Sequence, residues 1–289
     1  MLRAEAVKAA KESEVTIAFV GLSPSLEGEE MPVKLAGFSG GDRTSIDLPA
    51  SQEDLLKALA ATGKPLVVVL QNGSALAVNW AQEHADAILE SWYPGEEGGT
   101  AIAEALAGDF SPSGKLPVTF YRSVDQLPPF ENYEMNGRTY RYFSGEPLYP
   151  FGYGLSYANF EFSKLAFDKY TPAPTDDLTA TVDVKNVGRI ASDEVVELYL
   201  AHPGVDGAPI RWLAGMRRVR LSPGETKPVS IQIPNRELSI VGADGTRRIV
   251  PGELQVWVGD GQPVTHRGLT KAAGIAGSVT IRGNAILQK

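Results

Sequence analysis

A change in the spacing of apolar residues divides this chain into two parts. Up to about residue 120, short apolar runs alternate with amphipathic stretches, whereas after Phe160 only short strand-like runs follow. Repeated strand–helix–strand units favour a layered α/β sandwich with a mostly parallel sheet, and short strands between turns favour an all-β sandwich. The pattern therefore predicts an α/β domain over residues 1–157, including an aromatic turn-rich connector, and an all-β domain over residues 158–289.

The run Pro65–Leu70 fixes the arrangement of the first domain. It is apolar on both faces, which suits a central parallel strand covered by helices on each side. The other predicted strands are Val15–Val20, Ala87–Ser91 and Leu116–Phe120, and the predicted helices are residues 1–11, Ser51–Ala61 with Ser51 as N-cap, Ala75–Gln82 and Gly99–Leu106. Because the chain begins in the middle of this alternation, we expect the sheet to be incomplete at its N-terminus.

The second domain has the spacing of an immunoglobulin-like or fibronectin type III-like sandwich. Its predicted strands are Thr179–Asn186, Glu194–Ala201, Arg217–Leu221, Lys227–Ile233 and Glu253–Val258. Turn signals at Ser222–Gly224 and Pro251–Gly252 separate some of them. Because the sequence has no cysteine, the disulfide-linked version of this fold is excluded.

Composition narrows the range of partners. The net charge of −8 and the pI of about 5.1 argue against nucleic acid or an anionic membrane surface, and a neutral polar ligand stays compatible. No apolar run is long enough to span a membrane, and residues 1–11 lack the apolar core of an export signal, so the compartment stays undetermined. The absence of cysteine removes thiolate catalysis and zinc–thiolate sites.

An acidic cluster directly after the first predicted strand is the main candidate for chemistry. It places Glu27, Glu29 and Glu30 in a polar, Gly- and Pro-containing segment. Crowded carboxylates raise one another's proton affinity, which is one way to obtain a general acid near neutral pH. From residue types alone, a solvated acidic loop is the favoured interpretation.

Two other segments offer candidate ligand contacts. The glycine-rich loop Gly37–Arg43 carries Asp42 and Arg43, which could contact a ligand or pair with neighbours, and it matches neither a dinucleotide fingerprint nor a phosphate loop. In Trp92–Gly99, the side chains of Trp92 and Tyr93 could stack on a sugar, although a core position is favoured for Trp92.

Several other chemistries are disfavoured by spacing. The histidines His84, His202 and His266 lie far apart and show no metal-ligand spacing. Ser74 lacks the Gly-x-Ser-x-Gly context of a nucleophile elbow. We therefore expect no metal, no cofactor and no serine nucleophile.

Taken together, the motifs resemble the C-terminal half of a glycoside hydrolase family 3 enzyme, the β-glucosidase and β-xylosidase family. The resemblance covers essentially the whole chain. It is carried by Phe19–Leu22 with the acidic cluster, Gly41–Arg43, Trp92–Gly99, Gly114–Phe120, Gly137–Phe143, Pro150–Tyr157 and Arg217–Glu225.

This resemblance implies a third part that the sequence does not contain. Such enzymes combine a TIM-like barrel, an α/β sandwich and a fibronectin type III domain, and their barrel supplies the aspartate nucleophile of a retaining mechanism. The α/β domain supplies a glutamic acid/base, and the two carboxyl groups lie about 5–5.5 Å apart. By the family pattern the acid/base corresponds to Glu29, with Glu27 as the main alternative because of the inserted residues Pro32–Gly40.

The resemblance also implies a function and its alternatives. We expect part of an exo-acting enzyme that hydrolyses terminal β-D-glucosyl or β-D-xylosyl residues of oligosaccharides or glycosides, with little activity when its barrel is missing. A non-catalytic carbohydrate-binding or assembly module is the alternative, motivated by the aromatic segments Trp92–Tyr93 and Tyr140–Phe143. A surface normally covered by the barrel would be apolar and would favour a homo-oligomer.

Overall fold

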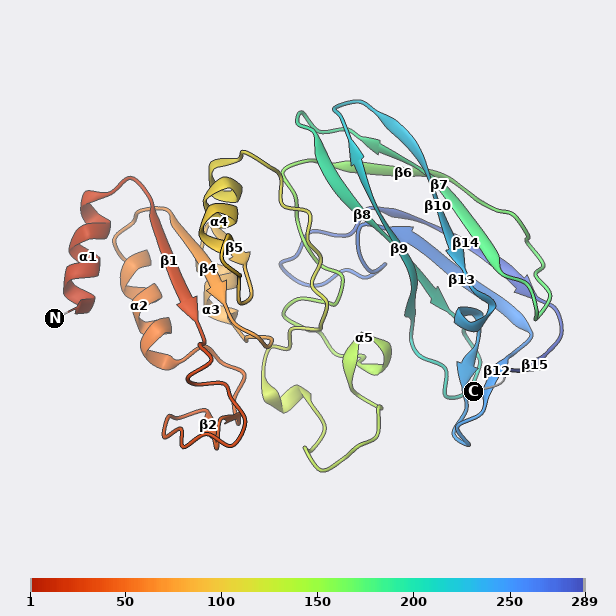
Figure 1. Ribbon diagram of the computed structural model, residues 1–289, viewed down its shortest axis with the longest axis horizontal. Helices are drawn as coiled ribbons and strands as arrows, with labels where there is room; N and C mark the ends of the chain where they lie inside the picture. Colours follow the sequence, from red (N-terminus) through yellow and green to blue (C-terminus); the bar gives the residue numbers. More distant parts are fainter. Residues whose placement is uncertain (1, 288–289) are drawn as a thin grey trace. The chain divides into compact units, whose positions relative to one another are not determined.

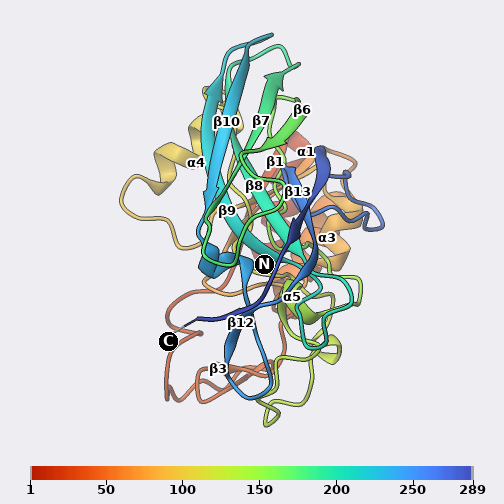
Figure 2. The same ribbon diagram turned by 90° about the vertical axis from the view of Figure 1, so that its right-hand side faces the viewer.

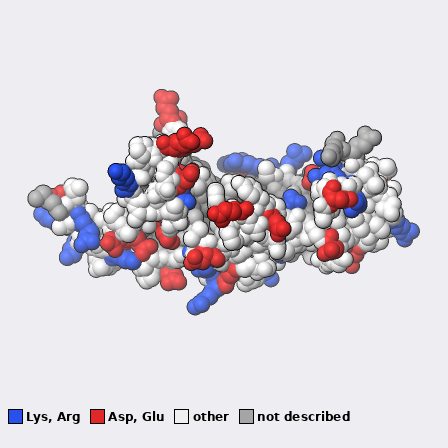
Figure 3. Space-filling view, turned by 90° about the horizontal axis from the view of Figure 1, so that it is seen from below, with Lys and Arg blue, Asp and Glu red and all other residues white. Residues whose placement is uncertain are grey.

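A computed structural model describes residues 2–287 and divides them into two compact units (Figure 1). The α/β unit contains residues 2–107, 120–127 and 146–148, and the sandwich unit contains residues 108–119, 128–145 and 149–287. No described helix is both long and apolar enough to cross a bilayer. Figure 3 shows acidic and basic side chains interspersed over the face in view, without a continuous basic surface.

The α/β unit is built on a three-stranded parallel sheet in the order β1-β4-β5. Its strands are β1 (Thr16–Gly21), β4 (Leu66–Gln71) and β5 (Ala87–Glu90), and a small hairpin is formed by β2 (Phe38–Ser39) and β3 (Asp42–Arg43). Its helices are α1 (Leu2–Glu12), α2 (Ala50–Ala60), α3 (Asn79–His84), α4 (Gly98–Ala107) and the short η1 (Val124–Gln126). Helix α2 contacts α1, α3 and β1, and Figure 2 shows α3 and α4 on opposite sides of the sheet.

Strand β4 is central because its side chains are apolar in both directions. Four of its six residues are buried, and it pairs with β1 on one side and β5 on the other. Helix α2 lies in the connection from β1 to β4, because parallel strands cannot be joined by a tight turn and need a crossover. These features confirm the predicted α/β layers.

Strand β1 lies at the edge of the sheet and leaves one apolar face open. Ile17 is 44% exposed and Phe19 is 55% exposed, whereas Ala18 and Val20 between and after them are buried. Thr16 and Leu22 donate their N–H groups toward β4, so the backbone groups of Ile17, Phe19 and Gly21 point away from it. The side-chain amide of Gln52 bonds both backbone groups of Gly21, accepting at 2.7 Å and donating at 2.8 Å.

Three local predictions for this half were wrong. Leu116–Phe120 forms no strand, because Pro117 has no N–H and Leu116 bonds instead to Gly152 and Tyr153. Helix α3 begins at Asn79 rather than Ala75, since Ala77 bridges to Asp47 in extended conformation. Ser51 lies inside α2, where Pro49 occupies the N-cap position without a side-chain bond.

The sandwich unit packs antiparallel sheets around one core, which confirms the predicted all-β fold. The two main sheets have the orders β10-β7-β6 and β14-β13-β8-β9, and a small third sheet has the order β11-β12-β15. Its elements are α5 (Thr139–Tyr142), β6 (Phe160–Phe167), β7 (Leu178–Asn186), β8 (Ser192–Ala201), β9 (Trp212–Leu221), β10 (Thr226–Ile233), η2 (Asn235–Leu238), β11 (Ile240–Val241), β12 (Arg247–Ile249), β13 (Gly252–Gly259), β14 (Gly274–Ile281) and β15 (Ala285–Ile286).

Alternating side chains fill the core between these sheets. Strand β7 buries Leu178, Ala180, Val182 and Val184 in strict alternation, and β10 does the same with Val229, Ile231 and Ile233. The period of two explains why sequence alone predicted these strands. Strand β14, which is rich in small residues, did not give a comparable signal.

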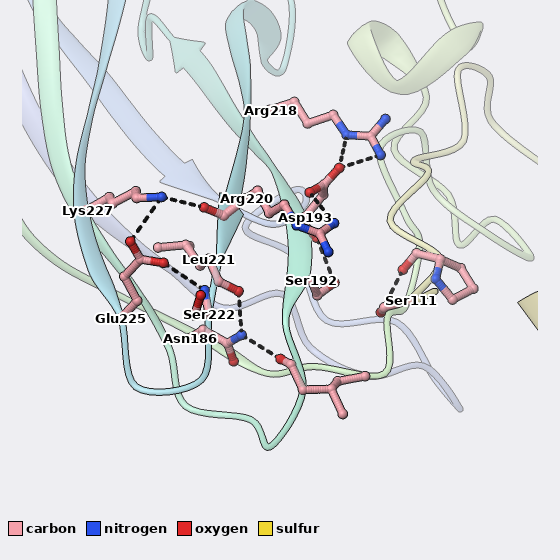
Figure 4. A network of polar contacts seen from close by, with 12 residues as sticks. Ser111, Asn186, Ser192, Asp193, Arg218, Arg220, Leu221, Ser222, Glu225 and Lys227 are labelled. Atoms are coloured by element: carbon pink, nitrogen blue, oxygen red, sulfur yellow. Dashed lines mark hydrogen bonds and ion pairs between the residues drawn. The ribbon is translucent and has the colours of Figure 1, made fainter. Parts of the chain in front are cut away.

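A buried asparagine ties two turns at one end of the sandwich (Figure 4). Asn186 is completely buried, and its Nδ2 donates to the carbonyls of Ile190 at 2.8 Å and Leu221 at 3.0 Å. Its Oδ1 accepts the N–H of Gly188 at 2.8 Å. One side chain therefore satisfies three backbone groups, namely the carbonyls of Ile190 and Leu221 and the N–H of Gly188.

We predict that Asn186→Ala lowers the free energy of unfolding of the sandwich unit by about 3 kcal/mol, because buried backbone groups lose their partners. Urea unfolding followed by tryptophan fluorescence measures the change. Ser230→Ala is the matched control, since Ser230 only shares an exposed hydroxyl pair with Thr181 and should change stability by less than about 0.5 kcal/mol. Equal losses in the two variants would contradict the assignment.

Candidate active site

The candidate site lies where the three parallel strands of the α/β unit end. The acid loop, Leu22–Met31, follows β1, Ser74 follows β4, and Tyr93 follows β5. The carboxyl ends of parallel strands meet at one edge of a sheet, which is where α/β folds place their ligands. Three segments that are distant in sequence therefore converge there.

Glu27 is the carboxylate on which these segments converge. The hydroxyl of Ser74 donates a short hydrogen bond to Glu27 Oε1, and the hydroxyl of Tyr93 donates to Oε2 at 3.1 Å. Each carboxylate oxygen thus accepts one hydroxyl, and the side chain is half-buried. Burial and the bond to Glu27 raise the pKa of the Tyr93 hydroxyl to about 12, so Tyr93 stays a donor at neutral pH.

Arg43 supports this arrangement from the β2–β3 hairpin. Its Nη1 donates to Ser74 Oγ at 3.0 Å, and its other bonds go to the backbone carbonyls of Ser45, Ala75 and Asp47. Burial lowers the pKa of Arg43, and the negative charge of Glu27 opposes that effect. The guanidinium therefore fixes the Ser74 hydroxyl and places a positive charge near Glu27.

The acid loop is held against the hairpin by a close backbone contact. A Cβ at Gly41, whose φ is +91°, would lie 1.6 Å from the carbonyl oxygen of Gly28. The N–H of Met31 also donates to the carbonyl of Gly40 at 2.8 Å. Only glycine fits at position 41, and this contact sets the position of the loop that carries Glu27.

The structure separates the other predicted site residues from this cluster. Glu29 and Asp42 are exposed, and neither side chain makes a hydrogen bond or ion pair within residues 2–287. Trp92 packs edge-on against Phe120 at 6.0 Å between ring centroids, which agrees with a core position. Its backbone has a φ of +56°, a conformation that costs a bulky residue about 1–2 kcal/mol.

Three polar residues of the site were missed from the sequence. The sequence presents Ser74 only as a possible nucleophile, and it places neither Asn72 nor Glu90 in a functional motif. Asn72 is completely buried, and burial raises the pKa of Glu90 to about 7 against the opposing effect of its hydrogen bonds. A signal was available, because each follows or ends an apolar strand. No group of three or more potential metal ligands gathers anywhere in the described part of the chain.

A carboxylate fixed by two hydroxyls at the carboxyl edge of an α/β sheet is a site suited to proton transfer. Residues 2–157 match the Glycosyl hydrolase family 3 C-terminal domain, and residues 194–262 match the Fibronectin type III-like domain. The chain therefore belongs to glycosyl hydrolase family 3.

Named relatives and solved structures agree with this membership. A xylan 1,4-beta-xylosidase of Xylanibacter ruminicola is 43% identical over 83% of this chain and 28% of its own length, and a periplasmic beta-glucosidase of Salmonella typhimurium is 41% identical over 88% and 34%. The structure of a β-glucosidase from Erythrobacter marinus is 36% identical with a TM-score of 0.82, covering 97% of this chain and 36% of its own. The chain thus spans about a third of the relatives it matches.

Proposed function

We propose that this chain supplies the general acid/base of a retaining exo-β-glycosidase that acts on terminal β-D-glucosyl or β-D-xylosyl residues, and that Glu27 is the acid/base. The observation that carries the proposal is the fixing of both Glu27 oxygens by Ser74 and Tyr93. In the first step Glu27 would protonate the glycosidic oxygen, and in the second it would deprotonate the attacking water.

Positioning favours Glu27 over Glu29. A retaining mechanism needs its two carboxyl groups about 5–5.5 Å apart, so the acid must be held in place. Glu27 has two hydroxyl donors and a nearby guanidinium, whereas the exposed Glu29 has no comparable support. The exposed edge of Tyr93 and the Arg43 guanidinium would then border the bound sugar, with Trp92 and Asp42 contributing less directly.

The second carboxylate would come from a barrel domain outside these 289 residues. The named relatives are about three times as long as the region matched, which leaves room for such a domain. An acid without its nucleophile contributes little, because the two act on the same bond. We therefore expect the chain alone to be nearly inactive.

A domain graft tests this proposal. The segment of the Xylanibacter ruminicola xylosidase that this chain matches is replaced by residues 1–289, and hydrolysis of p-nitrophenyl β-xyloside and β-glucoside is measured. We expect activity in the graft and almost none in the isolated chain or in the relative with its segment deleted. A folded but inactive graft would contradict the proposal, and full activity of the isolated chain would contradict the need for a barrel.

A non-catalytic carbohydrate-binding module is the second candidate, favoured by the ring of Tyr93, which is 41% exposed. Tyr140 does not support it, since its ring stacks on Phe151 and its hydroxyl accepts the N–H of Leu213. Calorimetric titration of the isolated chain with xylo- and gluco-oligosaccharides separates the two functions. If the isolated chain binds these oligosaccharides and the graft hydrolyses none of the substrates, the binding module is favoured.

Self-association through β1 is the expected behaviour of the isolated chain. The strand offers unpaired backbone groups together with the exposed side chains of Ile17 and Phe19, a combination that favours edge-to-edge pairing. Light scattering should show dimers or larger species that Phe19→Lys converts to monomers. Met216→Lys, which removes an even more exposed apolar residue from β9, should leave them unchanged. A monomeric parent chain would rule this association out.

A further inference from the structure

Glu90 links the two segments that hold Glu27. It is the last residue of β5, and its Oε1 accepts the N–H of Trp92 at 2.9 Å. Its Oε2 accepts the side-chain Nδ2 of Asn72 at 3.2 Å. One oxygen of the Glu90 carboxylate thus binds the segment after β4, and the other binds the segment after β5.

Asn72 passes this connection to Ser74. The same Nδ2 donates to the carbonyl of Ser74 at 2.9 Å, so Asn72 bridges Glu90 and the residue whose hydroxyl reaches Glu27. Its own Oδ1 is buried and accepts no hydrogen bond from the described residues. The two hydrogen bonds that Nδ2 donates therefore fix the orientation of the Asn72 amide.

Trp92 passes the connection to Tyr93. Its left-handed backbone turns the chain sharply after β5, and the bond from its N–H to Glu90 stabilises that turn. Tyr93 then extends its hydroxyl to Glu27 Oε2. Tyr93 follows Trp92 directly, and Ser74 lies two residues after Asn72. Both residues that donate to Glu27 are therefore close in sequence to a residue that Glu90 binds.

We infer that Glu90 is a positioning residue that sets the spacing of the Ser74 and Tyr93 hydroxyls, so that each donates to a different oxygen of Glu27. This role rests on the proposed part of Glu27 in proton transfer, but the geometry can be tested without it. The burial of an acid next to an apolar strand is otherwise unfavourable, because a carboxylate loses its hydration there.

The test uses the protonation of Tyr93 in the full chain as its readout. Chains labelled with ¹³C at the tyrosine ζ carbon are compared by NMR, with the Tyr93 signal assigned by Tyr93→Phe. At about pH 10.5, a tyrosine with a pKa of about 12 is almost wholly protonated, whereas a released tyrosine with an ordinary pKa is mostly ionised. Circular dichroism at the same pH verifies that each variant is folded.

Glu90→Leu should raise the ionised fraction of Tyr93 at least about fivefold, in the same direction as Glu27→Gln. Glu90→Gln, which keeps the size and one acceptor, should give an intermediate value and replaces Glu90→Leu if that variant does not fold. The matched control is Asp86→Ala, because Asp86 accepts the N–H of Leu66 at 2.8 Å at the opposite end of the same strands. It should leave the Tyr93 signal unchanged.

The outcomes separate this role from the proposed function. An unchanged Tyr93 signal in both Glu90 variants overturns the positioning role, whatever Glu27 does. An equal response in Asp86→Ala also overturns it, since the effect would then be general loosening of the sheet. If Tyr93 responds to Glu90 while the graft keeps full activity after Glu27→Gln, the positioning role holds and the acid/base assignment fails.

Discussion

Glu27→Gln in the grafted xylosidase should slow the hydrolysis of xylobiose by about 10²–10⁴-fold, the usual contribution of a general acid. The loss in kcat/KM should be far smaller for 2,4-dinitrophenyl β-xyloside, because dinitrophenolate departs without a proton. For that substrate the second step becomes limiting, since the attacking water no longer meets a base. Added azide needs no base and should restore turnover while forming the xylosyl azide.

Glu29→Gln is the control for this prediction. It removes a carboxylate from the same loop at a position where the side chain is exposed, so both substrates should be hydrolysed at nearly the parent rate. Steady-state kinetics with the two leaving groups, with and without azide, provide the measurement. A leaving-group-dependent loss in Glu29→Gln with none in Glu27→Gln would transfer the role to Glu29.

The second large effect concerns a group of buried acids in the sandwich unit. Glu194 and Glu197 lie on β8, are only 2% and 3% exposed, and share one cation, Lys115, with Asp260. The ammonium of Lys115 lies 3.4 Å from Glu194 and donates to the carbonyl of Gly154 at 2.9 Å. Burial outweighs this shared charge and raises the pKa of each glutamate to about 7.

The sandwich unit should therefore lose stability as the pH rises from about 4.5 to about 7. Below this window both glutamates are protonated in the folded and unfolded states. Within it, the folded state retains protons that the unfolded state has released, so the free energy of unfolding falls with pH. The loss approaches about 3 kcal/mol for each glutamate, and the full loss is present above about pH 7.

Urea unfolding at several pH values measures this dependence. Glu197→Gln removes one of the titrating groups while keeping a partner for the hydroxyl of Tyr199, which donates to Glu197 at 2.7 Å. The fall in the free energy of unfolding between about pH 4.5 and 7 should then be smaller than in the parent chain, because Glu194 and Asp260 still titrate. Glu253→Gln, at an exposed position of β13, should leave the slope as it is. A flat profile in the parent chain would show that these acids are ionised without penalty.

The elements that could be predicted from the sequence are those whose apolar spacing matches their burial. The apolar residues Leu66–Leu70 of β4 match its burial on both faces, and the alternation of β7 matches the burial of one face against the core. The predictions were wrong where the local sequence pattern favours one conformation and a contact with a distant segment imposes another. The apolar run before α3 resembles a helix, but Ala77 bridges to a loop about 30 residues earlier.

The location of the candidate site could be predicted from the sequence, but the contacts within it could not. Acids after β1 pointed to the carboxyl edge of the sheet. The choice between Glu27 and Glu29 depends on Ser74 and Tyr93, which lie 47 and 66 residues from Glu27 in sequence. Ser74 belongs to no recognised motif, and the motif Trp92–Gly99 that contains Tyr93 indicated sugar stacking rather than a bond to Glu27. Each hydroxyl acts by reaching across the sheet edge rather than through its neighbours in sequence.

The amide of Gln52 at the edge of β1 limits how far the sheet can grow. It occupies both backbone groups of Gly21 as a neighbouring strand would, so an added strand can form its ladder with Ile17 and Phe19 but not with the last residue. Pairing between β1 and an added strand must therefore stop before Gly21, the residue that precedes the acid loop. Whatever chain completes this sheet, its backbone cannot extend the strand pairing into the acid loop that carries Glu27.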